Sequence, residues 1–414
     1  MIENISNCDI LRRQVIPVAI FIYQLRFIIL ICLIFNLLFD KMYFINKTMR
    51  RDIIMKSVIA FITAVVTFFS GCFSNIVDTV FFPESPQTES VEFAKNLGNG
   101  WNLGNTLEAC EMGSSKKMGL ESEIYWGNPY TTKEMIEAVK NAGFGTVRIP
   151  ITWAQHLDEN YVIDEEWLAR VKQIVDWVLE YEMYAIINIH HDDTFWLVTD
   201  KAHEESATAV ITAIWSQVSE YFKDYDERLI FETMNEPRVV GCDTEWSGIP
   251  EHYEVVNNLN FAALKAIRQS GGKNGSRFVS VTTYAARCET KPVSALRLPD
   301  DPHVLVSIHC YYGTAHRSEF LDCENKLTLR EKYEMYKIFR DIYKIIIKKG
   351  YGVVLGEFGW TDRVNLENLA ERAEYFITTA NKFGIPCIVW DNGLDFRLFD
   401  RTTHVLEFPD YIKP

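Results

Sequence analysis

Short apolar runs alternate with amphipathic segments from about residue 90 onward, and this alternation restricts the fold more than any other feature of the chain. Repeated β-then-α units build a parallel sheet whose strands are joined by helical crossovers. The runs that we expect to be strands are 98–105, 146–151, 184–190, 229–234, 278–283, 304–309, 353–357 and 387–390. Eight such units predict a closed TIM (β/α)8 barrel in one catalytic domain.

Helical patterns with start and stop signals lie between these runs. Thr131 and Glu134 have the spacing of a capping box, and Asp164 suits the N-cap of a helix over 165–181. Glycine follows the other predicted helices, at 143, 271–272, 350 and 384, as expected for a left-handed C-cap. The further helices that we expect are 261–267, 333–349 and 366–383.

An open, doubly wound sheet is the alternative fold. It would require a glycine-rich phosphate loop after its first strand. Residues 98–104 contain glycines without the G-x-G-x-x-G spacing, and the sequence has no P-loop motif. The closed barrel is therefore favoured.

The N-terminal segment carries two export-like signals. Residues 15–39 are strongly apolar, and a charged patch near Met49 precedes a second apolar run that ends in Phe69-Ser70-Gly71-Cys72. That ending resembles a bacterial lipoprotein cleavage site, in which Cys72 would be lipidated and would anchor the protein. We expect residues 1–74 to be an export signal or membrane anchor, 75–91 a short tether and 92–414 the catalytic domain, with the protein secreted or held at a bacterial cell surface. Translation from Met49 or Met55 would leave a single signal.

The charge and the cysteines exclude several classes of function. The net charge of −14 argues against a nucleic-acid partner, because nucleic-acid binding needs a basic surface. None of the nine cysteines forms a C-x-x-C pair, which argues against a zinc or dithiol redox centre. A disulfide among Cys110, Cys242 and Cys288 stays open, while Cys310 and Cys387 lie in predicted strands.

Polar and aromatic residues end nearly every predicted strand. In a closed parallel barrel all these ends face one mouth, where such barrels carry their active sites. Gathering polar groups there costs desolvation, so stability alone does not explain them. The residues that we expect at this mouth are Asn105, Glu108, Arg148, His190, His191, Asp192, Asn235, Glu236, His309, Tyr311, Glu357, Trp390, Asp391 and Asn392.

Two of these residues, Glu236 and Glu357, come from the fourth and seventh strands, on facing sides of a barrel. Two carboxyl groups across a cleft are the equipment for cleaving a glycosidic bond. One protonates the leaving oxygen, and the other attacks the anomeric carbon or activates water. Arg148 would keep Glu357 ionised, and Asn235 could bind the sugar 2-hydroxyl.

Two other chemistries are less favoured. His190, His191 and Asp192, with His309 and Glu357, could be drawn as metal ligands, but adjacent residues of one strand point to opposite faces. A Ser-His-Asp hydrolase would need a G-x-S-x-G elbow, which is missing from the sequence. We therefore expect neither a metal nor another cofactor.

The motifs at these strand ends, taken together, resemble those of glycoside hydrolase family 5, the cellulase-type retaining glycosidases. The resemblance covers about Gly98 to Pro409. The motifs that carry it are Gly100-Trp101-Asn102-Leu103-Gly104-Asn105, Val147-Arg148-Ile149-Pro150, Ile189-His190-His191-Asp192, Phe231-Glu232-Thr233-Met234-Asn235-Glu236-Pro237, Ile308-His309-Cys310-Tyr311, Gly356-Glu357-Phe358-Gly359 and Val389-Trp390-Asp391-Asn392-Gly393.

The resemblance implies a role for each residue. Glu236 would be the general acid/base, protonated when substrate binds, and Glu357 the ionised nucleophile, with their carboxyl groups about 5–5.5 Å apart. Arg148 and Tyr311 would support the nucleophile. The residues implied to line the cleavage subsite are His190, Asn235 and His309, the last also tuning Glu236. The residues implied to contact sugars are Trp390, as a platform, with Asn105, Glu108, His191, Asn392 and Trp196; Trp126 is a weaker candidate.

The implied substrate is an internal β-1,4-glucosidic bond of cellulose or a related β-glucan. Relatives acting on xyloglucan, mixed-linkage glucan, xylan or mannan are the alternatives, and a transglycosylase uses the same chemistry. A non-catalytic glycan-binding barrel is the alternative outside enzymes, although such a protein would be expected to lose one carboxylate. Oligomeric state stays open.

Two segments depart from the family pattern. Residues 313–317 follow the sixth strand where relatives carry a longer polar and aromatic insert, which bears on the leaving-group subsites. The sequence also ends at Pro414, about where a last barrel helix is expected, so either 407–413 supplies a minimal closing element or the natural protein runs further.

Overall fold

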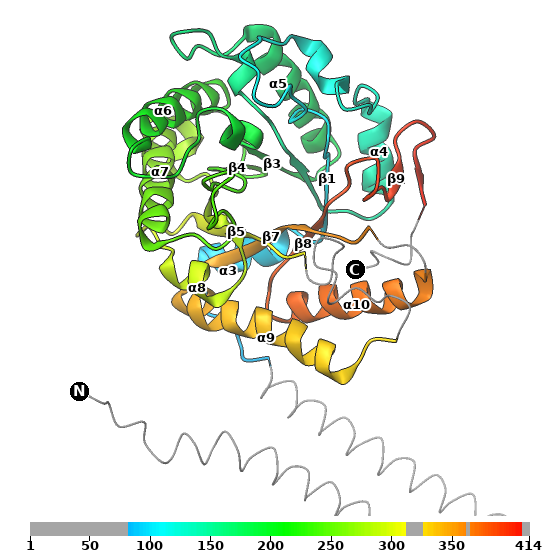
Figure 1. The fold of residues 1–414 in the computed structure, drawn as a ribbon. Helices are drawn as coiled ribbons and strands as arrows, with labels where there is room; N and C mark the ends of the chain where they lie inside the picture. Colours follow the sequence, from blue (N-terminus) through cyan, green and yellow to red (C-terminus); the bar gives the residue numbers. More distant parts are fainter. Residues whose placement is uncertain (1–81, 312–325, 362–364, 408–414) are drawn as a thin grey trace, which may run out of the picture. The chain divides into compact units, whose positions relative to one another are not determined.

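Eight parallel strands close into a barrel, which confirms the predicted TIM fold (Figure 1). The computed structural model describes residues 82–311, 326–361 and 365–407. Each strand pairs with the next in sequence, and the last pairs with the first. The strands are β1 (Gly100–Asn102), β2 (Thr146–Ile149), β3 (Tyr184–Asn188), β4 (Leu229–Glu232), β5 (Val279–Arg287), β6 (Val304–His309), β7 (Gly352–Phe358) and β8 (Cys387–Val389).

Helices surround the barrel as crossovers between consecutive strands (Figure 1). The long ones are α4 (Lys133–Asn141), α5 (Glu165–Glu180), α6 (Glu204–Tyr221), α7 (Pro250–Gln269), α9 (Leu329–Ile345) and α10 (Leu366–Lys382). The shorter elements are α8 (Thr290–Ala295), the 3-10 turns η1 (Leu120–Ile124), η2 (Ala154–His156), η3 (His191–Thr194), η4 (Gly272–Gly275) and η5 (Ile347–Lys349), and a hairpin of β9 (Phe399–Asp400) and β10 (Val405–Leu406).

The predicted helix signals are mostly correct. Asp164 caps α5 by accepting the Trp167 N–H at 2.9 Å, and Gly350 and Gly384 adopt left-handed backbones with φ of 95° and 76°. The expected cap at Thr131 is wrong, because the neighbouring Thr132 hydroxyl accepts the Met135 N–H at the start of α4. Helix α6 was not among the predicted helices.

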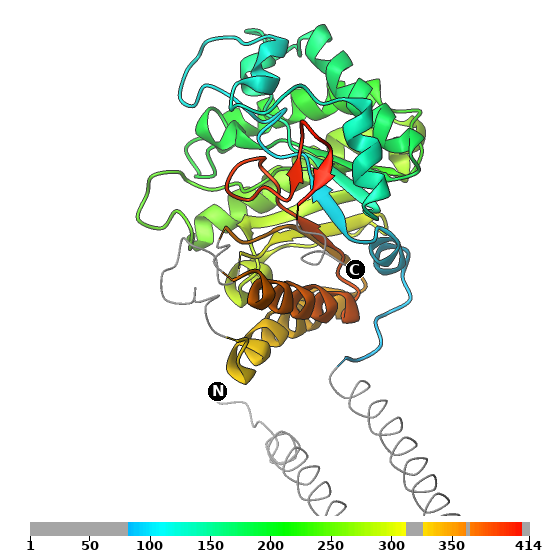
Figure 2. The ribbon, with the colours of Figure 1, turned by 90° about the vertical axis from the view of Figure 1, so that its right-hand side faces the viewer.

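Helix α3 (Glu89–Asn96) covers the end of the barrel where the strands begin. The Ser90 hydroxyl donates to the Val304 carbonyl at 2.5 Å and accepts the Gly352 N–H at 2.7 Å. Phe93 stacks on Phe278, with ring centroids 3.7 Å apart. Figure 2 shows α3 and the long connecting loops on opposite sides of the barrel. The expected tether, 75–91, therefore ends too late, because its last three residues already belong to this helix.

Several expectations fall outside the described residues. They concern the lipoprotein-like site at Cys72, the loop at 313–317 and the closing segment at 408–413. Within the described ranges, the helices are all too short or too polar to cross a bilayer.

Candidate active site

The barrel interior changes from apolar to polar along its axis. Near α3 it is filled by an apolar cluster that includes Ile186, Ile230 and Leu305. Because side chains on a strand alternate, the next inward-facing positions are two residues further on. They are Asn188, Glu232 and Ser307, joined by Asn102 and Arg148 from the first two strands, and all are buried. The strands thus place a layer of polar side chains directly beneath the mouth.

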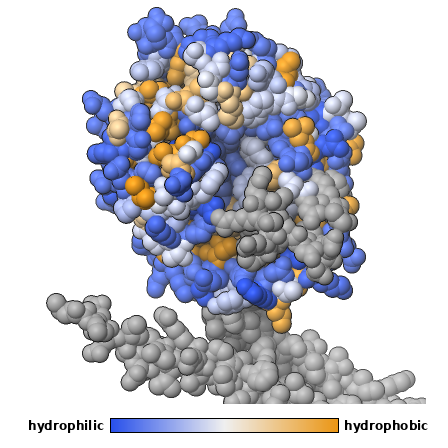
Figure 3. Space-filling view, viewed as in Figure 1, coloured by the Kyte–Doolittle hydropathy of each residue, from blue (hydrophilic) through white to orange (hydrophobic). Residues whose placement is uncertain are grey.

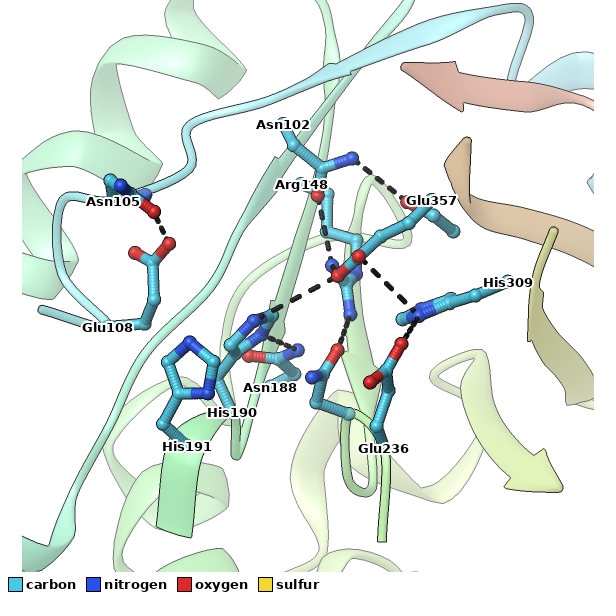
Figure 4. Close-up of polar contacts among 12 residues, drawn as sticks. Asn102, Asn105, Glu108, Arg148, Asn188, His190, His191, Glu236, His309 and Glu357 are labelled. Atoms are coloured by element: carbon cyan, nitrogen blue, oxygen red, sulfur yellow. Dashed lines mark hydrogen bonds and ion pairs between the residues drawn. The ribbon is translucent and has the colours of Figure 1, made fainter. Parts of the chain in front are cut away.

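Arg148 is the centre of this layer. Its side chain is fully buried, and Glu232 binds it through Nε at 2.6 Å and through Nη2 at 3.1 Å. Nη1 donates to Oδ1 of Asn102 at 2.9 Å and to Oε1 of Glu357 at 2.7 Å, while Nη2 donates to Oδ1 of Asn235 at 2.7 Å. One guanidinium therefore fixes two mouth residues, as Figure 4 shows for Glu357. Since the Asn235 oxygen faces Arg148, its amide donors face away from the guanidinium.

The two predicted carboxylates lie together at the mouth. Glu357 accepts a hydrogen bond from the Tyr311 hydroxyl on Oε2 at 2.6 Å, in addition to Arg148 on Oε1. Nδ1 of His309 lies 2.8 Å from Oε1 of Glu236 and 3.6 Å from Oε2 of Glu357 (Figure 4). An oxygen of Glu236 and an oxygen of Glu357 lie within 4.8 Å of each other. This spacing is close to that of retaining glycosidases and shorter than the roughly 6.5–9.5 Å of inverting ones.

Electrostatics set the protonation of these groups in the free protein. Burial of the Glu236 carboxyl raises its pKa, but the hydrogen bond from His309 and the charges of His309 and Arg238 outweigh burial, so its pKa lies below the ordinary value. Burial raises the pKa of Tyr311 well above its ordinary value, and the charge of Glu357 raises it further. The Tyr311 hydroxyl is therefore a donor to Glu357 at neutral pH.

His190 is held as a neutral donor. Burial lowers its pKa well below the ordinary value, and the nearby charges of His191 and Arg148 lower it further. Oδ1 of Asn188 accepts the Ile151 N–H at 3.1 Å, so its amide nitrogen donates to Nδ1 of His190, also at 3.1 Å. The imidazole proton is thereby assigned to Nε2, which lies 3.9 Å from Oε1 of Glu357.

The predicted aromatic platform lies beside this histidine. The ring of Trp390 is parallel to that of His190, with centroids 5.8 Å apart and an angle of 6° between the planes. A side-chain carbon on Gly104 would lie 2.9 Å from two atoms of the Trp390 ring, so the segment after β1 can pass this ring only at a glycine. The partly exposed His191 packs against His190 and, at 5.4 Å between centroids, against Trp126.

Three residues predicted to bind substrate make structural hydrogen bonds. Glu108 is fully buried, and its carboxylate accepts the backbone N–H groups of Asn105 and Thr106. Oδ1 of Asn392 accepts the N–H groups of Leu394 and Phe396, which closes the turn after β8. The indole of Trp196 donates to Asp192 at 2.7 Å. Carboxylates and amides at strand ends also cap turns, and the sequence pattern does not separate the two uses.

Asn105 remains at the mouth with a partly exposed side chain and a left-handed backbone, at φ of 53°. The short loop that carries it is fixed by Glu108 and by Asn128, whose amide donates to the Asn105 carbonyl at 2.9 Å. The Asn105 side chain is thus left partly exposed on a loop whose backbone is fixed.

The metal hypothesis is not supported by the arrangement of its ligands. Asp192 accepts the Trp153 N–H at 3.0 Å and the Trp196 indole, and His190 is engaged by Asn188. Among the described residues, the acidic and imidazole groups that come close enough to share an ion are Glu236, His309 and Glu357. The guanidinium of Arg148 already occupies one oxygen of Glu357 in that group.

The disulfide considered among Cys110, Cys242 and Cys288 is not formed. All five cysteines of the described residues carry free thiols.

The main residue that sequence reasoning missed is Glu232. It lies inside an apolar run, where a charged residue is almost never buried without a partner. Its partner Arg148 also occupies an inward position of its strand, so strand alternation combined with charge could have paired them. Asn102 and Asn188 were also missed. Each is a buried polar residue at the last inward position of its strand, so strand alternation could have found them as well.

Comparisons with known proteins agree with the fold. The family model described as cellulase (glycosyl hydrolase family 5) matches residues 108–395. Endoglucanase A of Clostridium longisporum is 42% identical over 330 residues, which cover 77% of this chain and 64% of that protein. The chain therefore spans less than two thirds of that relative's length.

Solved structures of endoglucanases superimpose on this chain. A broad-specificity endoglucanase from Clostridium longisporum superimposes with a TM-score of 0.73 at 40% identity, covering 79% of this chain and 97% of that one. A xyloglucan-specific endo-β-1,4-glucanase from a metagenomic library, in complex with cellotriose, has a TM-score of 0.73 at 34% identity, covering 78% and 96%. The fold of this chain is thus shared with endoglucanases of known structure. The chain belongs to glycosyl hydrolase family 5.

Proposed function

We propose that this chain is a retaining endo-1,4-β-glucanase that hydrolyses internal bonds of cellulose and related β-glucans by double displacement. The observation that carries the proposal is the pair of carboxylates, Glu236 and Glu357, with oxygens within 4.8 Å and His309 Nδ1 between them. Family membership and the names of the relatives support the β-1,4-glucan class of substrate.

Glu357 is the nucleophile. Arg148 and Tyr311 stabilise its negative charge on separate oxygens, which also fixes the plane of the carboxylate. In the first step the carboxylate attacks the anomeric carbon and forms a glycosyl ester, while the bond to the leaving oxygen breaks. In the second step water attacks the same carbon and releases Glu357, so the configuration is retained.

Glu236 transfers the proton in both steps. The hydrogen bond from His309 and the charge of Arg238 lower the pKa of Glu236 in the free protein. Glu236 must be protonated when substrate binds, because in the first step it donates a proton to the leaving oxygen. In the second step Glu236 accepts the proton of the attacking water.

The mouth residues position the sugar around this chemistry. The Asn235 amide is directed towards the 2-hydroxyl, and the neutral His190 donor lies on the nucleophile side. Trp390 supplies the apolar platform, with Asn105 and His191 at the neighbouring sugar. The mouth face of the barrel is mainly hydrophilic with a hollow near its centre (Figure 3), which suits a polysaccharide chain.

The first experiment is a substrate panel with viscosity and reducing-sugar release on carboxymethylcellulose, mixed-linkage glucan, xyloglucan, xylan and mannan. A fast fall in viscosity on the glucans that is lost in Glu236→Gln is expected. Mannan or xylan as the sole substrate would keep the mechanism and overturn the glucan assignment. If the folded protein binds glucans without cleaving them, the glycan-binding barrel is favoured. If products longer than the substrate form at high sugar concentration, the protein is a transglycosylase.

We also propose that the protein is exported and tethered through Cys72, since the segment up to that residue has the layout of a lipoprotein signal. Mass spectrometry of the native protein should find a lipidated peptide that begins at Cys72. An unmodified peptide that spans Gly71 and Cys72 would contradict the tether. Peptides that precede Met49 would contradict a start at that residue.

A further inference from the structure

Arg238 provides a second cation beside the Glu236 carboxylate, in addition to His309. Its Nη1 donates to the Glu236 backbone carbonyl at 3.0 Å and lies 3.7 Å from Oε2 of the side chain. His309 approaches the other oxygen, Oε1, at 2.8 Å. The carboxylate therefore lies between the Arg238 guanidinium and the His309 imidazole, which come from different sides of the mouth.

Arg238 is held in this position by two further carboxylates. Asp193, in η3, accepts from Nη1, and Glu245 accepts from Nε at 3.0 Å. Glu245 is itself fixed, because its second oxygen accepts the Gly241 N–H at 2.9 Å. The side chain of Arg238 is only 14% exposed, and its guanidinium lies 4.5 Å from the centre of the Trp246 ring. A guanidinium bound on these sides has little freedom to leave Glu236.

Asp193 is an unusual counter-charge, since its side chain is 2% exposed. Among the described residues, its Oδ1 has no hydrogen-bond partner. Burial raises the pKa of Asp193 to about 6, opposed by the charge of Arg238, and the negative charge of Glu236 raises it again. Asp193 and Glu236 therefore interact electrostatically across Arg238.

We propose that Arg238 is a positioning residue for proton transfer, which holds Oε2 of Glu236 and, balanced by Asp193, sets the pH at which the active site loses its catalytic proton. The inference rests on the proposed role of Glu236 as acid/base. A positive charge at Arg238 makes Glu236 lose its proton more easily, and a negative charge at Asp193 makes the loss harder. The other charged and titratable groups near Glu236 stay unchanged in the experiment below; they are His309 from β6, Tyr311 from the segment after β6, Glu357 from β7, Arg148 from β2, which binds Glu357, and His191 from η3. Glu245, from the loop after β4, binds the far side of Arg238 and offers a second negative charge for the test.

The test uses the opposite signs of these two charges. In a pH profile of kcat/KM on a soluble β-glucan, from about pH 4 to about pH 9, the basic limb reports loss of the proton from the general acid, Glu236. Arg238→Gln should move this limb up by about 1 pH unit, and Asp193→Asn should move it down. Arg238→Lys keeps the charge and should leave the limb near its wild-type position.

Arg238→Gln and Asp193→Asn break the same ion pair. If this pair had only a structural role, the basic limbs of the two variants would move in the same direction or not at all. Either result would overturn the inference. If Asp193→Asn does not fold, as judged by its melting curve, Glu245→Gln removes a negative charge from the other side of Arg238 and should also lower the limb. An unmoved limb in that variant would count against the inference.

The same experiment separates this inference from the proposed function. Glu236→Gln that is as active as wild type would refute the acid/base assignment and the inference together. The role of Arg238 alone would be refuted by a different set of results. In that case the wild type shows a basic limb and Glu236→Gln is inactive, but the limb does not move in the charge variants.

Discussion

Glu232 binds Arg148 through two nitrogens of the guanidinium, at 2.6 and 3.1 Å, in a layer where both side chains are at most 1% exposed. The same guanidinium holds Glu357 and Asn235 from its other edge. Glu232 itself has no access to the mouth, so it acts on a sugar only through Arg148.

Glu232→Gln should therefore lower both stability and turnover. Removing one charge of a buried pair costs on the order of 3 kcal/mol, and Arg148 would no longer be held against Glu357. Thermal melting and kcat check this. Glu180→Gln, which breaks the exposed pair with Lys133, is the control and should leave both quantities unchanged. A Glu232 variant with wild-type kcat would show that Arg148 does not need this partner.

Glu357→Ala should reduce kcat by about 10⁴–10⁶-fold, because the variant lacks the group that forms the covalent intermediate. Azide should restore part of the activity by entering the space left by the carboxylate. Its attack on the anomeric carbon gives the glycosyl azide of inverted configuration. NMR of the product distinguishes the two anomers, and a rescued product of retained configuration would contradict the nucleophile assignment.

Asn235→Ala should lower kcat by roughly 10²-fold and change KM much less. The Asn235 oxygen is fixed by Arg148 at 2.7 Å, so its amide donors are oriented before the sugar binds and act mainly as charge develops. Steady-state kinetics on one soluble glucan measure both constants. Asn235→Asp keeps the acceptor towards Arg148 without the donors and should show the same loss. A rise in KM alone would place Asn235 in ground-state binding.

Glu108→Gln should change stability and not substrate binding. A glutamine offers one acceptor to two backbone N–H groups, so one buried donor stays unpaired at a cost of about 1–3 kcal/mol. KM should remain within about twofold of wild type, since no catalytic contact is lost. A raised KM with an unchanged melting temperature would restore the substrate-binding role implied by the family resemblance.

The stability difference between wild type and Glu108→Gln should also depend on pH. Burial raises the pKa of Glu108 from 4.5 to about 7, partly opposed by its backbone hydrogen bonds. The unfolded carboxyl ionises first as pH rises, so the contribution of Glu108 is full below about 4.5 and is lost as pH passes about 7. Melting temperatures at several pH values should therefore converge towards high pH. A constant difference would mean that the folded pKa is not raised.

The barrel, the strand ends and the two carboxylates were all predictable because each follows from a local pattern. Apolar runs of strand length define the eight strands, and the parallel arrangement brings their ends to one mouth. The sequence pattern did not distinguish the groups that only face the mouth from those that also hydrogen-bond to the backbone of its loops. Glu108 and Asn392 follow strands just as Asn105 and Trp390 do, and only their hydrogen bonds to nearby backbone N–H groups separate them.

The protonation state of Glu236 was also beyond the sequence. It depends on His309 and Arg238, which approach different oxygens of one carboxylate from different strand ends. Spacing along the chain places such residues at the mouth without fixing which atoms meet. The pKa of Glu236 depends on these atomic distances, which the sequence does not give. A helix or strand, in contrast, can be predicted from periodicity alone.

Helix α3 closes the end of the barrel opposite the mouth. It is bound to the starts of β6 and β7 through Ser90, and its residues Ala94 and Leu97 belong to the same buried apolar cluster as Ile186 and Ile230. An extended ligand at the mouth can therefore lie only across the barrel and cannot pass through it.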